Sequence, residues 1–334
     1  MSEATSTCQT TPQRLRDLYF PIRDEIEEVE EILRDELRSD HPFVDRLVQH
    51  GFRLGGKRLR PALLLLSAKA CGKITREHIV LAAVMEMIHT ASLIHDDVLD
   101  EAILRRHLRT VNAQWDNEAS VLLGDYLFAR SMCLASGLES KYASRAISEA
   151  SGRMCEGELR QVGSRGNFQL AEEDYLEIIA GKTAAMYACC CRLGAYHAGA
   201  EPETREALGR FGDAFGIAFQ ITDDVLDLRG TEAVAGKSLG TDLNKQKPTL
   251  PIIRLLSQLD RQQRAEVEGI LRRGDDHRAE ALRPWLQRYD AIAYAQQTAL
   301  RYVRRAQQEL DAVPCSPARE TLKDLADFVI LRDQ

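Results

Sequence analysis

Two copies of the pentapeptide DDVLD are the strongest chemical signal in this chain. The first begins at Asp96 and the second at Asp223. On a helix, Asp96 and Asp100 share a face and lie about 6 Å apart along the axis. Asp223 and Asp227 repeat that spacing. Carboxylates so placed repel each other, so we expect a bound cation to offset them. Such ligands suit Mg²⁺, which takes one or two carboxylates and keeps water and substrate phosphate as its other ligands.

The alternative is that each motif is a solvated helix face, which is the usual meaning of a run of charges. Both motifs, however, follow apolar runs: MEMIHTASLI is separated from Asp96 by one residue, and FGIAFQIT ends directly before Asp223. Their helices are therefore expected to be buried up to the aspartates. Two copies in the same setting favour a pair of metal sites over two solvated faces.

Carboxylates with Mg²⁺ imply a phosphate ligand, and basic residues stand at defined places in the chain. GGKRLRP puts Lys57 and Arg60 after a Gly-Gly turn and beside a helix start marked by Pro61. Free backbone N–H groups at a helix start favour an anion. Other basic residues lie after the first motif, beside Thr183 and in the segment 228–249, namely Arg105, Arg106, Lys182, Lys237 and Lys247.

Composition limits the class of protein. The chain has 334 residues, 44% hydrophobic and 28% charged, which is typical of a soluble globular protein. Its net charge of -7 argues against a general nucleic-acid binder. No stretch is expected to cross a membrane, and residues 1–14 are predicted to be a disordered lead-in rather than a signal peptide. Eight cysteines lack metal-ligand spacing and are interpreted as reduced thiols of a cytoplasmic protein.

Hydrophobic periodicity predicts an all-α fold. Apolar residues recur at spacings of three and four, as in Ile26, Val29, Leu33 and Leu37, and the alternation expected of strands is scarce. We expect ten to thirteen helices in one domain, residues 15–334. The glycine-containing and net basic segment 228–249 is long for a connection within a bundle, and is predicted to be a functional flap.

Taken in order, these motifs resemble the trans-isoprenyl diphosphate synthase (polyprenyl synthetase) family. The resemblance runs from GGKRLRP through both DDVLD motifs, EGELRQ, YLEIIAGKTAAM and GKSLGTDLNKQKPTLP to LADFVILRD. It implies an all-α bundle around a deep central cavity, usually a homodimer. It also implies Mg²⁺-dependent, head-to-tail condensation of isopentenyl diphosphate onto an allylic diphosphate, which gives a polyprenyl diphosphate.

The resemblance also implies roles for individual residues. Metal ions that grip the allylic diphosphate would be held by Asp96, Asp97, Asp100, Asp223, Asp224 and Asp227. The cradle of that diphosphate would be completed by Arg105, Lys182 and Lys237, with Lys247 as a further substrate-binding lysine of the flap. Isopentenyl diphosphate would be bound by Lys57, Arg60, His89 and Arg106. The oxygen dipoles of Thr183 and Gln220 would face the developing allylic cation.

Small residues near the first motif predict a long product. Ser92 lies one turn before Asp96 on nearly the same face, and Ala91 precedes it. The family places bulky aromatics there to stop chain growth, so their absence suggests an octaprenyl to decaprenyl product, with Met85 as a deeper stop. The alternatives are a farnesyl or geranylgeranyl diphosphate synthase, a terpene cyclase, and a non-catalytic partner subunit.

The chain departs from the family pattern at two turns. After Arg106 the family usually has glycine and, two positions later, often proline, but this chain has His107 and Arg109. Gln246 occupies a position in the flap that glycine commonly holds. Neither change removes a charged ligand, although the turn at His107 is expected to differ.

Overall fold

The computed structural model describes residues 11–53, 56–229, 241–273 and 277–331. The first half of the chain forms α1 (Thr11–Tyr19), η1 (Phe20–Ile22), α2 (Arg23–Glu36), α3 (Pro42–Arg53), α4 (Leu59–Cys71), α5 (Arg76–Leu99), α6 (Val111–Gln114), α7 (Asn117–Ser136) and α8 (Lys141–Gly163). The second half forms α9 (Glu172–Ile179), η2 (Ala180–Ala184), α10 (Ala185–His197), α11 (Pro202–Arg229), α13 (Thr241–Asn244), α14 (Leu250–Gln258), α15 (Arg261–Leu271), α16 (Arg278–Arg288), α17 (Ala291–Glu309), η3 (Leu310–Ala312) and α18 (Pro317–Leu331).

The all-α prediction is confirmed, with one small addition. β1 (Leu104–Arg105) and β2 (Leu108–Arg109) pair antiparallel directly after the first aspartate motif. The described residues form seventeen α-helices, so the predicted ten to thirteen is wrong. Short helices such as α6 and α13 account for much of the excess, because four residues are too few to show a hydrophobic period. Helix α1 begins at Thr11, inside the predicted lead-in.

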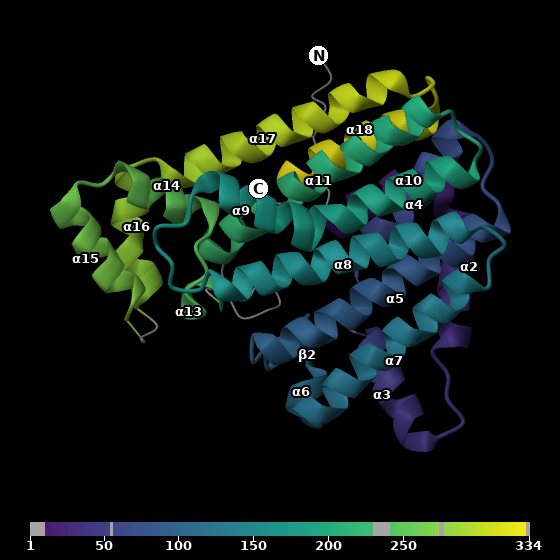
Figure 1. The fold of residues 1–334 in the computed structure, drawn as a ribbon, viewed down its shortest axis with the longest axis horizontal. Coiled ribbons are helices and arrows are strands. Elements are labelled where there is room, and N and C mark those ends of the chain that lie inside the picture. Colours follow the sequence, from purple (N-terminus) through teal and green to yellow (C-terminus); the bar gives the residue numbers. More distant parts are fainter. Residues whose placement is uncertain (1–10, 54–55, 230–240, 274–276, 332–334) are drawn as a thin grey trace, which may run out of the picture.

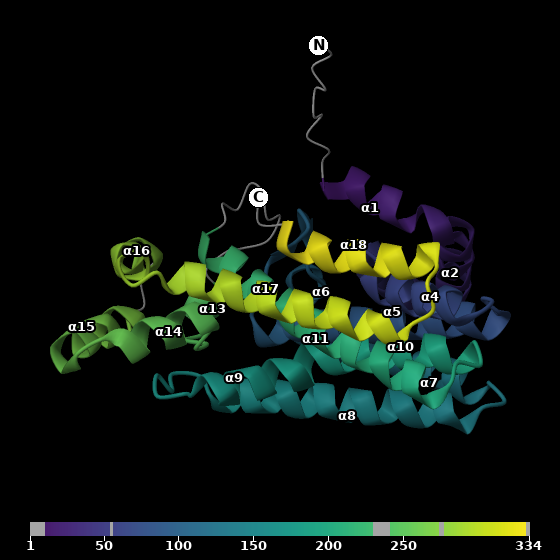
Figure 2. The same cartoon turned by 90° about the horizontal axis from the view of Figure 1, so that it is seen from above.

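The centre of the bundle is built from α4, α5, α10 and α11, which pack against one another. Helix α4 contains the run PALLLL and is apolar on nearly every face, and Leu63 to Leu66 are fully buried. A helix that is apolar all round must be surrounded by other elements. In Figure 1 the long helices α8, α10, α11 and α17 run lengthwise, and α14, α15 and α16 gather at one end. Figure 2 shows α1 and α18 on one side of this core and α8 and α9 on the other.

Helix α5 is the element that carries the first aspartate motif into the bundle. By length and composition it could cross a membrane, so the expectation that no stretch is long and apolar enough is wrong on that criterion. Within the fold, however, 72% of its apolar window is buried by other parts of the chain. Packing inside the bundle accounts for its apolar sequence.

Candidate active site

The first aspartate motif lies where α5 ends. Asp96 is in the last turn, and Asp100 is the C-cap, whose N–H donates to the Asp96 carbonyl at 2.8 Å. Asp97 is 2% exposed, and both of its carboxylate oxygens accept from Arg105, with Arg105 Nη2 at 2.8 Å from Oδ1. The structure therefore pairs Asp97 with Arg105. From the sequence, a metal ion is the expected ligand of Asp97 and the allylic diphosphate that of Arg105.

The second motif lies in the last turns of α11 and is linked to the first by α13 and the segment that follows it. Asp227 Oδ2 accepts from the N–H of Asp242 at 3.2 Å. Lys247 Nζ lies 3.3 Å from Asp242 Oδ1 and 3.1 Å from Asp100 Oδ1, and Lys247 is only 7% exposed. Burial lowers the pKa of Lys247, but Asp242 and Asp100 outweigh this effect and raise it. A charged ammonium thus links the surroundings of the two motifs.

Lys182 lies opposite Asp96 and is held by α8. Its ammonium forms an ion pair with Glu158 and donates to Gln161 Oε1 at 2.8 Å. Burial raises the pKa of Asp96, and the Lys182 charge opposes that shift. Burial also lowers the pKa of Lys182, but Asp96 and Glu158 raise it above its ordinary value. Both groups are therefore stabilised in their charged forms by each other.

The backbone that presents Lys182 is a π-helical turn, η2. Such turns are rare and frequent at functional sites. The turn packs backbone to backbone on α8: a Cβ at Gly157 would collide with the Lys182 nitrogen, and one at Gly181 would lie 3.0 Å from the Arg153 carbonyl oxygen. Two glycines thus let the turn approach α8 closely enough for Lys182 to reach Glu158.

A hydrogen-bonded chain connects Thr183 of this turn with the second motif. The Thr183 hydroxyl donates to Gln220 Oε1 at 2.8 Å, and Gln220 Nε2 donates to Asp224 Oδ1 at 2.8 Å. Tyr175 OH donates to the other oxygen of Asp224 at 2.7 Å. Burial, and then the charge of Asp242, raise the pKa of Asp224 to about 7. The structure thus joins Thr183, Gln220 and Asp224, as a shared site requires.

Three of the residues expected to bind isopentenyl diphosphate, His89, Arg60 and Arg106, lie together in a second basic group. The pKa of His89 falls well below its ordinary value because of burial and the charges of Arg60, Arg105 and Arg106. His89 is therefore neutral, and its buried Nδ1 has no hydrogen-bond partner among the described residues. A Cβ atom placed on Gly56 would lie 3.2 Å from Arg106 Nη2. Gly56 therefore packs closely against the Arg106 guanidinium. Arg60 also lies over the Tyr187 ring, at 4.6 Å.

The two departures from the family pattern have a clear backbone signature. His107 has φ 63°, and Arg106 before it has φ 52°, as the two central residues of a type I′ hairpin turn require. Gln246 has φ 52°. These left-handed conformations favour glycine, which explains the family preference. The chain adopts these conformations with ordinary side chains.

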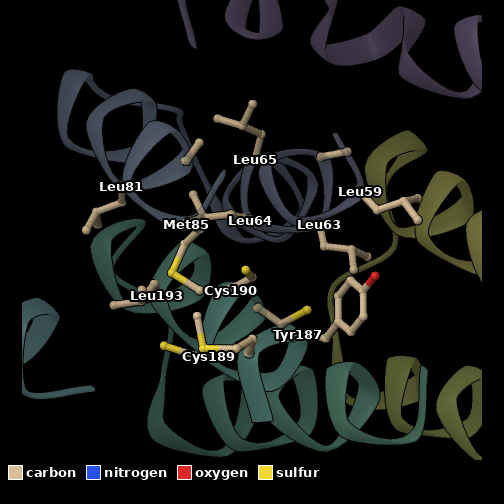
Figure 3. Packing of buried hydrophobic residues seen from close by; sticks show 14 of the residues in the cluster. Leu59, Leu63, Leu64, Leu65, Leu81, Met85, Tyr187, Cys189, Cys190 and Leu193 are labelled. Atoms are coloured by element: carbon tan, nitrogen blue, oxygen red, sulfur yellow. The ribbon is translucent and has the colours of Figure 1, made fainter. Parts of the chain in front are cut away.

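The residues expected to set product length lie along α5. Ala91 is 2% exposed, Ser92 is half-buried, and its hydroxyl donates to the His89 carbonyl at 2.8 Å. Met85 is fully buried, and Figure 3 shows it among Leu64, Leu81 and other apolar side chains. Two hollows of about 230 and 270 Å³ lie against α17 and touch none of these residues. The deep central cavity remains a prediction.

Lys237 lies outside the described residues, and Lys57 lies exposed in the loop before α4. Three further polar residues reach the site from elements to which the sequence suggests no role. Glu158 and Gln161 hold Lys182, and Arg165, after α8, lies 3.7 Å from Asp100. In EGELRQ, Glu158 and Gln161 are three residues apart and so share a helix face. That spacing is the sequence signal for these two residues.

The donor set fits a metal that is shared with a substrate. Among the described residues, no group of three or more His, Cys, Asp or Glu side chains is close enough to hold an ion alone. Mg²⁺ needs only one or two carboxylates when phosphate and water supply its other ligands. Asp96 and Asp100, with Asp223 and Asp227 on α11, offer such oxygens. The Lys247 ammonium lies between Asp100 and Asp242. The carboxylates around this space therefore favour a bound cation.

The chain matches a known protein family over most of its length. A model described as polyprenyl synthetase matches residues 41–286. The chain belongs to the polyprenyl synthetase family. An all-trans-nonaprenyl-diphosphate synthase (geranyl-diphosphate specific) of Rhodobacter capsulatus is 35% identical, over 96% of this chain and 98% of that protein. A heptaprenyl diphosphate synthase component 2 of Geobacillus stearothermophilus is 36% identical, over 96% and 99%. A protein named short chain isoprenyl diphosphate synthase is 35% identical in sequence.

The solved structures agree with the sequence relatives. A polyprenyl synthase of Caulobacter crescentus, crystallised with calcium and isoprenyl diphosphate, has a TM-score of 0.91 at 32% identity, over 96% of this chain and 98% of that one. These findings confirm the predicted family, the isoprenyl synthase fold and an enzyme of the prenyltransferase class. The individual site residues remain predictions that the geometry above supports.

Proposed function

We propose that the chain is a Mg²⁺-dependent, trans-type polyprenyl diphosphate synthase that condenses isopentenyl diphosphate head-to-tail onto an allylic diphosphate. The observation that carries this proposal is the bridge between the two aspartate motifs. Lys247 contacts Asp100 of the first motif and Asp242, whose N–H in turn donates to Asp227 of the second. Two acidic motifs that are held together through a cation suit a ligand whose charge and metal ions both motifs share.

The allylic diphosphate would lie between the motifs. Bound Mg²⁺ would supply the charge that stabilises the departing diphosphate. Lys182 and Lys247, both charged, add fixed cations on either side, and Arg105 is held in place by Asp97. Fixed charges of this kind need no reorganisation when the leaving group develops its charge.

Thr183 and Gln220 would act on the carbon side of the breaking bond. The chain of donors from Thr183 through Gln220 to Asp224 fixes the orientation of both side chains. Their oxygen dipoles would favour the allylic cation, and no side-chain nucleophile is needed. Apolar surroundings exclude the water that would quench the cation, and the released diphosphate would accept the proton lost from the new unit.

Isopentenyl diphosphate would bind at the second basic group. Arg60, Arg106 and Lys57 supply positive charge, and the neutral His89 supplies a ring that can donate a hydrogen bond. Arg60 Nε, like His89 Nδ1, is buried without a hydrogen-bond partner in the described part of the chain. Unpaired buried polar atoms are costly, and a bound anion would accept from Arg60 Nε and from His89 in the tautomer that carries its proton on Nδ1.

The product is proposed to be long, from octaprenyl to decaprenyl. Ser92 and Ala91 present no bulky side chain below Asp96. The test is incubation of the purified protein with Mg²⁺, isopentenyl diphosphate and each allylic primer, followed by mass measurement of the lipid. We expect long chains from the wild type and shorter ones from Ser92→Phe. A product that stops at farnesyl or geranylgeranyl would overturn the length, whereas incorporation only after addition of a second protein would favour the subunit alternative.

Homodimerisation and a cytoplasmic location are also proposed. Exposed apolar side chains on two neighbouring helices support the dimer: Leu122 on α7 is 61% exposed, and Leu159 on α8 is 72% exposed. Helices α7 and α8 follow one another in the chain and contact each other. Large apolar side chains that are exposed on neighbouring helices are the kind of surface that a second copy of the chain would cover.

A further inference from the structure

The loop that begins with the Gly-Gly turn is held by helices from the N-terminal end of the chain. Tyr19, the last residue of α1, donates from its hydroxyl to the Lys57 carbonyl at 2.6 Å. This short bond joins residues 38 positions apart in sequence. It fixes the backbone at the lysine that is proposed to bind isopentenyl diphosphate.

Arg58, the next residue, is clamped from two other helices. It has φ 52° and is the N-cap of α4. Its guanidinium donates to Glu30 of α2 at 2.5 Å and to the buried Glu86 of α5 at 2.6 Å. Arg58 therefore points inward and anchors the loop that carries Lys57.

The hydroxyl of Tyr19 is a permanent donor. Burial, and then the nearby Glu86 and Tyr187, raise the pKa of Tyr19 well above its ordinary value. The same glutamate accepts a hydrogen bond from Arg58, so Tyr19 and Arg58 both lie near Glu86 beneath the loop. Loss of the Tyr19 hydroxyl would remove this hydrogen bond from the Lys57 carbonyl. The hydrogen bonds of Arg58 to Glu30 and Glu86 would persist.

We propose that Tyr19 is a positioning residue for isopentenyl diphosphate, which fixes the Lys57 backbone so that the loop presents its cations in one arrangement. This inference rests on the proposed isopentenyl diphosphate site. Tyr19 and Glu30 both lie before residue 41, where the family match begins. The N-terminal helices thus contribute to substrate affinity from outside the matched segment.

The test compares Tyr19→Phe, which keeps the ring and removes the donor, with the wild type. Isopentenyl diphosphate alone cannot react without an allylic partner, so its affinity can be measured by calorimetry on the full chain. Loss of one hydrogen bond predicts an affinity about three- to tenfold weaker. The KM for isopentenyl diphosphate should rise equally, with kcat and the KM for the allylic primer unchanged. Tyr142→Phe is the matched control, because Tyr142 stacks on Tyr196 at a ring distance of 3.9 Å, remote from the loop.

The outcomes separate this inference from the proposed function. An unchanged affinity in Tyr19→Phe, or an equal loss in Tyr142→Phe, would overturn the role of Tyr19. If the wild type binds no isopentenyl diphosphate, or if Lys57→Gln binds it normally, the proposed site itself is wrong. Should Tyr19→Phe lose its helicity, Glu30→Gln tests the same loop from α2, and unchanged affinity there would count against the inference.

Discussion

At the scale of single residues, the site is organised by paired charges. Asp97 is matched by Arg105, Asp96 by Lys182, and Asp100 by Lys247. Breaking a buried pair leaves an uncompensated charge, which costs several kcal/mol, so these side chains hold one another in place before substrate arrives. The site is therefore preorganised by the same groups that would bind a diphosphate and its metal ions.

Replacement of His107 by glycine should stabilise the protein. A non-glycine residue in the left-handed region costs about 1 kcal/mol, and His107 has φ 63°. His107→Gly should raise the free energy of unfolding by a similar amount in denaturant titrations. A destabilised His107→Gly would show that the side chain makes a larger contribution than the backbone strain.

The raised pKa of Asp224 predicts a pH dependence of stability. The folded carboxyl keeps its proton up to a pH of about 7, whereas the unfolded one loses it near its ordinary pKa of 3.8. Between these values the folded state binds more protons, so this group makes the protein less stable as the pH rises. Asp224→Asn lacks that titration. In EDTA, its free energy of unfolding relative to wild type should increase from pH 4 to 7, by at most about 4 kcal/mol. A difference that stays constant with pH would contradict the assignment.

At the scale of elements, the π-helical turn η2 depends on its contact with α8. Gly157→Ala should force the turn away from α8, because the new methyl group would overlap the Lys182 backbone. We expect a loss of at least tenfold in kcat and a lower melting temperature. Gly152→Ala is the matched control: it lies on the same helix with nothing within 4 Å, and should stabilise by about 1 kcal/mol. Equal activity in the two variants would refute the role of this contact.

Sequence reasoning predicts elements whose signal is local. The helix of the first motif and the shared face of Asp96 and Asp100 follow from period and spacing. The π-helical turn could not be predicted, because AGKTA reads as ordinary helix and the distortion arises from packing against Gly157. The pairing of Asp97 with Arg105 likewise depends on a hairpin turn made without glycine.

At the scale of the whole molecule, the fold gathers segments from across the chain at one site. Tyr19, Arg60, Asp96, Lys182 and Asp224 come from five different elements of the bundle. The order of the motifs in the sequence predicts this gathering through family resemblance, whereas composition and periodicity predict only that the protein is all-α. Contacts such as that between Tyr19 and Lys57 have no sequence signal, because they join distant positions through single hydrogen bonds.

The surface of α7 and α8 predicts the oligomeric state. Wild-type protein should sediment as a dimer, and Leu122→Glu or Leu159→Glu should shift it towards monomer because a charge would be buried in the interface. Phe20→Glu is the control, since Phe20 is 73% exposed on η1, at another part of the molecule. A monomeric wild type, or a dimer that both α7 and α8 variants preserve, would contradict this surface assignment.

The central claim is that both aspartate motifs hold one diphosphate through shared metal ions. Calorimetric titration of inorganic pyrophosphate in the presence and absence of Mg²⁺ tests it without turnover. We predict binding that requires Mg²⁺ and weakens at least about tenfold in either Asp96→Asn or Asp223→Asn, with helicity preserved. Pyrophosphate that binds equally well in EDTA, or that is insensitive to the loss of one motif, would contradict the account.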